Sequence, residues 1–159
     1  MMDVMNKAPR HELKLVRDIN APREKIFKAW TTPELMKQWF CPLPWKVTEA
    51  DLDVRAGGHS RIMMQGPEGE PIRNEGVYLE VVENEKLVFT DAFTEGWVPT
   101  EKPFMVGVVL LEELAGGRTR YTAKALHWTE EDRKSHEAMG FHEGWGAATD
   151  QLMAILARM

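Results

Sequence analysis

The sequence predicts one α+β domain, in which an antiparallel sheet of about six or seven strands packs against a long C-terminal helix. Three observations predict it. Residues 11–20 alternate as a half-buried strand does, two helix-start signals follow directly, and residues 129–157 carry apolar side chains at helical spacing. Because 159 residues with 43% apolar content suit one core, we expect a single domain over 1–159, with 1–10 as a flexible N-terminus.

Two short helices are expected after the first strand. Asn20 can cap the first of them, and Pro22 suits its first turn. Thr32 and Pro33 repeat the same signal for the second helix. The pair lacks the basic face of a DNA-reading helix-turn-helix, so a nucleic-acid groove is not expected there.

The middle of the chain is predicted to form strands separated by turns. Gly-rich or polar stretches interrupt the alternation, and two of the turns are short enough to join hairpins. Residues 94–102 break the pattern and are expected to be the least ordered piece. The predicted strands cover residues 45–54, 59–65, 72–82, 86–93, 104–113 and 118–128.

The C-terminal segment predicts one long helix that lies on the sheet. Thr129 is an N-cap followed by three acidic residues, which favour the positive end of a helix. Three glycines inside the segment weaken it by about 1 kcal/mol each relative to alanine. Its apolar face, which must contact the sheet, consists of Ala138, Phe141, Trp145, Ala148, Leu152 and Ile155.

Charge and cysteine content exclude several classes of protein. The net charge of −5 comes from acidic and basic residues mixed along the chain, so no nucleic-acid surface is expected. No signal peptide or membrane span appears near the start, so the expected location is the cytoplasm. Cys41 is the only cysteine, which rules out an internal disulfide, and it is expected to be a small buried hydrophobe.

Several segments, taken in order, resemble one family. They are residues 17–40 (RDINAPREKIFKAWTTPELMKQWF), 53–58 (DVRAGG), 76–81 (GVYLEV), 85–90 (EKLVFT) and 144–145 (GW). This chain is similar to the START-like (SRPBCC, birch-pollen-allergen-like) proteins related to activators of heat-shock protein 90 ATPase. The resemblance implies the helix-grip fold, in which a curved sheet wraps around the C-terminal helix. It also implies binding or conversion of hydrophobic molecules such as lipids.

A helix resting on a curved sheet cannot fill the whole concavity, so we expect an apolar ligand cavity between them. For any one residue, ordinary core packing is the competing interpretation, and only the collection favours a pocket. The large side chains expected to bind the ligand are Trp30, Trp39, Phe40, Met63, Tyr78, Phe89, Phe93, Met139, Phe141 and Trp145.

Four polar residues on predicted strands could anchor a ligand: His59, Arg61, Asp91 and His127. If a histidine and an aspartate met within hydrogen-bond reach, they could act as general acid and base on a carbonyl substrate. Alternation does not decide their faces, because Ile62 and Met64 compete with Arg61 and Met63 for the inside.

No metal or other cofactor is expected. His136 and His142 lie six positions apart, which separates their side chains by roughly 240° around a helix, so they cannot share an ion. Both histidines are instead expected to be exposed to solvent or to cap a helix.

The leading hypothesis is therefore a non-catalytic binding protein for a small hydrophobic or amphipathic molecule. One alternative is an enzyme of the polyketide cyclase or aromatic-compound type, motivated by His59, Asp91 and His127. Another is a chaperone-interacting module, which the family resemblance alone suggests. A second copy of the chain, in a homodimer, is another candidate partner.

Overall fold

The computed structural model describes residues 11–159, so the expected flexible segment 1–10 lies outside the described residues. The elements in chain order are β1 (Glu12–Ile19), α2 (Arg23–Thr31), α3 (Pro33–Met36), β2 (Lys46–Leu52), β3 (His59–Gln65), β4 (Pro71–Val82), β5 (Lys86–Thr90), β6 (Phe93–Thr94), β7 (Val98–Pro99), β8 (Val106–Leu114), β9 (Arg118–Leu126), α4 (Glu130–Ala138) and α5 (Phe141–Leu156). Among them, no helix has both the length and the apolarity that crossing a bilayer requires.

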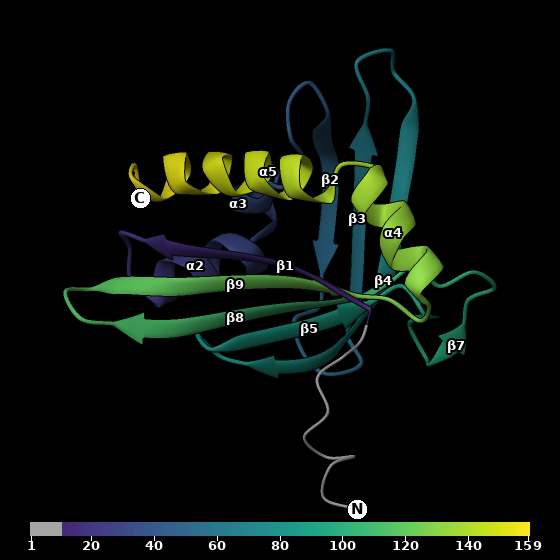
Figure 1. The fold of residues 1–159 in the computed structure, drawn as a ribbon, viewed down its shortest axis with the longest axis horizontal. Helices are drawn as coiled ribbons and strands as arrows, with labels where there is room; N and C mark the ends of the chain where they lie inside the picture. Colours follow the sequence, from purple (N-terminus) through teal and green to yellow (C-terminus); the bar gives the residue numbers. More distant parts are fainter. Residues whose placement is uncertain (1–10) are drawn as a thin grey trace, which may run out of the picture.

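Within the described residues, seven strands form one antiparallel sheet in the order β1-β9-β8-β5-β4-β3-β2. This confirms the predicted α+β class. The pairing register shifts between Val47 and Glu49 on β2 and between Tyr78 and Glu80 on β4. Such irregularities bend a strand and increase its twist. Figure 1 shows the result: β2, β3 and β4 run steeply across the direction of β1, β9 and β8, and α5 lies along β1.

The two short helices form as predicted, but the capping of the first differs. Pro22, in an extended conformation, is the N-cap residue of α2, and no side chain caps that end. Asn20 stands two residues before this N-cap and is not the cap itself, so that prediction was wrong. Thr32 and Pro33 take the expected N-cap and first positions of α3, although the Thr32 hydroxyl makes no capping hydrogen bond.

Residues 94–102, predicted to be the least ordered, include most of a small hairpin of β6 and β7. Its turn uses the left-handed region at Gly96 (φ 89°) and at Trp97 (φ 61°). Glycine adopts this region without strain, whereas tryptophan rarely does. The preceding strand β5 ends at Thr90 rather than at the predicted Phe93, because the chain turns there to enter this hairpin.

The single long C-terminal helix that was predicted is two helices. Gly140, at φ 100°, separates α4 from α5, and a backbone in this left-handed conformation cannot continue a right-handed helix. The N-cap prediction for Thr129 is confirmed, since its hydroxyl accepts a hydrogen bond from the Asp132 N–H at 3.0 Å. In Figure 1, α4 turns away from the axis of α5 at this break.

The main core joins α2 and α5 to the sheet around Trp30. The Trp30 ring meets the Trp39 ring edge-on with centroids 4.9 Å apart. Its Nε1–H donates a hydrogen bond of 3.1 Å to the buried Tyr121 hydroxyl of β9. From α5, Leu152 and Ile155 close this core.

Gly76 and Gly144 should respond oppositely to alanine. At Gly144 an added Cβ meets nothing within 4 Å, so Gly144→Ala should stabilise α5 by about 0.5–1 kcal/mol through lower chain entropy. At Gly76 the Cβ would collide with the Thr90 carbonyl oxygen, so Gly76→Ala should destabilise by about 2 kcal/mol or more. Urea unfolding of both variants tests the pair, and equal effects would contradict this packing.

Tyr121→Phe should destabilise the protein by about 1–3 kcal/mol, because it leaves the buried Trp30 N–H without an acceptor. Urea unfolding measures the loss. In a Trp30→Phe background the same change should cost clearly less, since the donor is already gone. If Tyr121→Phe costs the same in both backgrounds, the hydrogen bond contributes nothing to stability.

Candidate functional site

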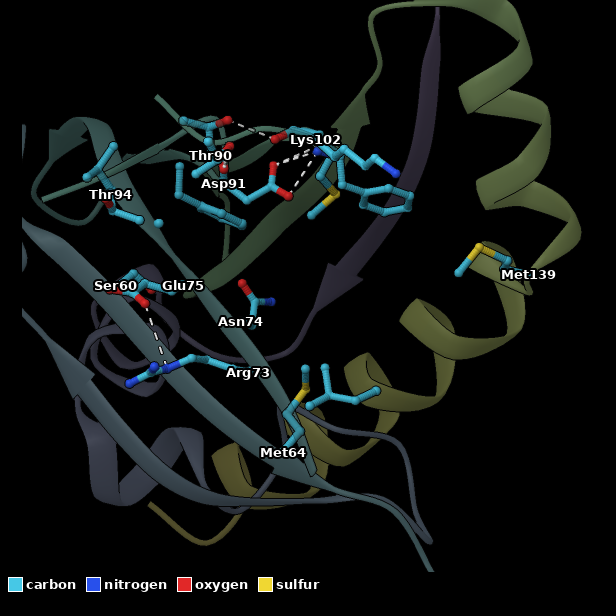
Figure 2. Close-up of a pocket in the computed structure, with 17 residues that line it drawn as sticks. Ser60, Met64, Arg73, Asn74, Glu75, Thr90, Asp91, Thr94, Lys102 and Met139 are labelled. Atoms are coloured by element: carbon cyan, nitrogen blue, oxygen red, sulfur yellow. Dashed lines mark hydrogen bonds and ion pairs between the residues drawn. The ribbon is translucent and has the colours of Figure 1, made fainter. Parts of the chain in front are cut away.

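A hollow of about 620 Å³ lies beside the core, between β3 and β4 on one side and residues 100–105 on the other. Met139, at the end of α4, borders it from across the gap, as Figure 2 shows. The apolar part of its wall consists of Met64, Ile72, Val77, Phe89, Phe104, Met105 and Met139. The hollow therefore opens where the break between α4 and α5 faces the bent sheet.

Gly107 makes the floor of this hollow possible. In the β5–β8 pairing Gly107 stands opposite Phe89, and the Phe89 ring occupies the space that a Cβ on Gly107 would need. The Phe89 ring also packs against Trp30, with centroids 5.7 Å apart. Phe89 is thus the wall between the aromatic core and the hollow. A glycine inside a predicted strand is the sequence signal for such a close approach.

Asp91 holds the 100–105 segment in place. Its carboxylate accepts hydrogen bonds from the backbone N–H groups of Phe104 at 2.9 Å and Met105 at 3.1 Å. The Thr90 hydroxyl donates to the Met105 carbonyl at 2.9 Å, and the Thr100 hydroxyl donates to the Asp91 carbonyl at 2.7 Å. Asp91 therefore borders the hollow, but its acceptor capacity is directed at the backbone.

The side chains of Asn74 and Lys102, two polar residues of the wall, make no hydrogen bond or ion pair with any other described residue. Figure 2 shows the Asn74 amide on β4 pointing into the hollow. Both side chains are exposed. The wall thus offers an amide, which can donate and accept, and an ammonium group, which can only donate.

His59 and Arg61 lie on the face of β3 opposite to Ser60 and Met64, which border the hollow. The His59 ring contacts Asp51 at 3.0 Å and Glu95 at 3.3 Å. Arg61 donates to Glu75 at 3.1 Å and to Glu95 at 3.2 Å. The contact with Asp51 raises the pKa of His59, and His59 in turn lowers the pKa of both carboxyls. This is a self-compensating ion-pair network.

Two members of this network, His59 and Glu95, lie near Asp53, and one possible ligand atom of each of the three lies within 4.8 Å of the others. All three side chains are of types that can bind a metal ion. They do not fit a metal well. Asp53 already accepts a hydrogen bond of 2.9 Å from Arg55, and Glu95 accepts one from Arg61. Because two guanidinium groups neutralise these carboxylates, a cation would have to displace both.

The aromatic residues predicted to bind the ligand mostly pack elsewhere. Of the ten, Phe89 and Met139 border the hollow. The hollow lies nearer to β3 and β4 than was predicted and does not border Trp145. The others pack in the main core (Trp30, Trp39, Phe40, Tyr78), in the smaller core cluster beneath α5 (Phe141, Trp145), against Trp97 (Phe93) or at a second hollow of about 430 Å³ that Arg61 also borders (Met63).

His127 and His136 form a buried pair beside the hollow. His127 Nδ1 lies 2.8 Å from the Phe104 carbonyl oxygen, and its Nε2 lies 2.9 Å from His136 Nδ1. Burial first, and His127 second, lower the pKa of His136 to about 4. His136 was predicted to be solvated or capping, which was wrong, because it is only 8% exposed. The sequence does carry a signal for this burial. The other side chains of α4 are almost all charged or polar, so His136 is the one best able to pack against the core.

The three residues that motivated the cyclase alternative do not converge. His59 is on the far face of β3, Asp91 is bound to backbone N–H groups, and both nitrogens of His127 have partners. No acid–base pair drawn from these three therefore faces the hollow.

Comparisons with known proteins agree on fold and family. The chain shares 39% identity with a protein from Nitrosomonas europaea, with a TM-score of 0.90 and coverage of 95% of this chain and 97% of the other. A protein from Mycobacterium smegmatis has 26% identity, a TM-score of 0.78 and coverage of 92% and 91%. An AHSA1-like protein from Aeromonas hydrophila, at 17% identity and a TM-score of 0.68, covers 92% and 93% and shares the fold.

The search of curated proteins found no match. Residues 20–157 match the family model described as activator of Hsp90 ATPase homolog 1-like protein. That match spans most of the chain, from the two short helices to the end of α5. The chain therefore belongs to the family of activator of Hsp90 ATPase homolog 1-like proteins, as its sequence motifs had predicted.

Proposed function

We propose that this protein binds a small amphipathic molecule in the hollow between β3, β4 and residues 100–105. The observation that carries the proposal is the size and lining of that hollow. Its volume of about 620 Å³ falls within the range typical of small-molecule sites. The family's fold supports a ligand-binding domain in general.

The apolar part of the wall would hold the body of the ligand. Phe89, Met105, Met64 and Ile72 all line the hollow, and methionine side chains adapt to different shapes. Ile72, Phe104 and Met139 remain partly or largely exposed beside the opening, with Met139 72% exposed. Covering these side chains with a ligand would remove apolar surface from water, which favours binding.

Asn74 and Lys102 would orient the polar end of the ligand. Because neither side chain is engaged by another described residue, each keeps its hydrogen-bonding capacity for a guest. An amide and an ammonium together suit a carbonyl or carboxylate oxygen as the ligand's acceptor. This favours an amphipathic ligand over a purely apolar one.

The alternatives have less support. The enzyme hypothesis depended on His59, Asp91 and His127, which lie apart from one another or are already engaged. A chaperone partner is suggested by the family description alone. A homodimer and a cytoplasmic location stay predictions from the sequence.

Asn74→Trp should block the hollow, because Asn74 points into it from an exposed position where a large ring can be placed without disturbing the core. We expect N-phenyl-1-naphthylamine, a neutral fluorescent probe, to bind the unmodified protein with micromolar affinity and to bind Asn74→Trp at least about tenfold more weakly. Fluorescence titration measures both constants.

Glu112→Trp is the matched control. Glu112 is exposed near the far end of β8, seven residues after Met105, which precedes the strand and lines the hollow, so its variant adds the same ring elsewhere. Its affinity for the probe should stay within about twofold of the unmodified protein. No binding by the unmodified protein, or equal loss in both variants, would refute the proposed site.

A further inference from the structure

We propose that the His127–His136 pair is a pH-sensitive latch that holds α4 beside the hollow, so that acid releases α4 and opens the hollow. The latch deepens the proposed function, on which its role in ligand entry rests. Two elements that border the hollow meet at this pair. The Phe104 carbonyl bonds to His127, and His136 belongs to the helix that ends next to Met139.

The hydrogen-bond chain fixes where the protons are in the neutral pair. The Phe104 carbonyl can only accept, so His127 must carry its hydrogen on Nδ1 and present Nε2 as an acceptor. His136 must then carry its hydrogen on Nδ1, which donates to His127 Nε2 across 2.9 Å. One chain of hydrogen bonds thus ties residues 100–105, the end of β9 and α4 together.

The docking of α4 depends on His136 more than on any other side chain of that helix. His136 is the one residue of α4 that is buried. Its ring meets the rings of Phe104 at 4.8 Å and Phe141 at 5.3 Å, both edge-on. The rest of α4 is mostly charged, so it contributes little apolar burial, and the left-handed Gly140 gives the chain a joint at the end of the helix.

Protonation opposes this packing in two ways. A single proton leaves a charge among aromatic rings, where water cannot solvate it fully. A proton on each ring gives both facing nitrogens a hydrogen, which breaks the contact between them. In either case the charged His136 ring is better solvated in water than in its docked position. When the ring moves into water, α4 moves with it.

The charged groups around the pair have other partners. Glu130 contacts Arg133 at 2.8 Å and His11, at the start of β1, at 3.4 Å. Glu137 contacts Arg133 at 3.2 Å and His142 of α5 at 2.9 Å. Asp91, under Phe104, accepts from backbone N–H groups. Burial and His127 are the causes that lower the pKa of His136, and no carboxylate offsets them.

The direction of the pH effect follows from linkage. A histidine with a pKa of about 4 when docked and 6.5 when released binds more protons in the released state below pH 6.5. Docking is therefore fully stable above that pH and weakens as the pH falls toward 4. Between pH 7.5 and 5.0 the docking equilibrium constant should fall by about 30-fold.

Hydrogen exchange of the α4 amides tests the latch without any ligand. After correction for intrinsic exchange rates, their protection should fall by about 30-fold from pH 7.5 to 5.0 in the unmodified protein. In His136→Phe, which keeps an aromatic ring but cannot titrate, the protection should not change with pH. His142→Gln, which removes an exposed histidine at the same joint, should keep the pH dependence of the unmodified protein.

Stopped-flow binding of N-phenyl-1-naphthylamine tests the gating. Its association rate should rise at pH 5.0 in the unmodified protein and stay constant in His136→Phe. Pocket opening is refuted if α4 protection falls with no change in that rate. If the probe does not bind at pH 7.5, the proposed function fails, while hydrogen exchange still decides the latch.

Nuclear magnetic resonance titration of the histidine rings in the unmodified protein decides the matter if His136→Phe does not fold. His136 should titrate well below its ordinary range, together with the loss of the α4 signals of the docked state. Titration near pH 6.5 with α4 unchanged, or unchanged α4 protection between pH 7.5 and 5.0, would overturn the latch.

Discussion

The Trp30 indole is the contact on which the arrangement of this domain depends. It joins α2 to β9 through the Tyr121 hydroxyl, and its ring packs against Trp39 and Phe89. These aromatic rings pack in one core with the aliphatic end of α5. Phe89 lies at the edge of that core, and the hollow begins on its other side. The position of the hollow therefore follows from where the aromatic core ends.

The sequence predicted the order and type of the elements because each signal is local. The alternation along β1, the prolines that start α2 and α3, and the Thr129 cap all act within a few residues. The break at Gly140 was not predictable in the same way, since a glycine inside a helix costs only about 1 kcal/mol and is often tolerated. The break places His136 against His127, a contact between segments distant in the sequence that no local pattern records.

The site was harder to predict than the fold for a related reason. Large aromatic residues were expected around a cavity, but such side chains gain most by packing against one another, and here they form the core. The faces of β3 were undecidable from alternation, because each face carries both polar and apolar residues. His59 and Arg61 joined an ion-pair network on one face, whereas Ser60 and Met64 border the hollow on the other.

The aromatic core and the hollow lie side by side, and this separation has an evolutionary consequence. Under the proposed function, replacements around Asn74 or Met139 would change what the protein recognises, while the aromatic packing near Trp30 would continue to support folding. Selection on such a ligand site would then explore new chemical specificities at little risk of misfolding. Diverged members of one lineage would then share a backbone and differ in their guests.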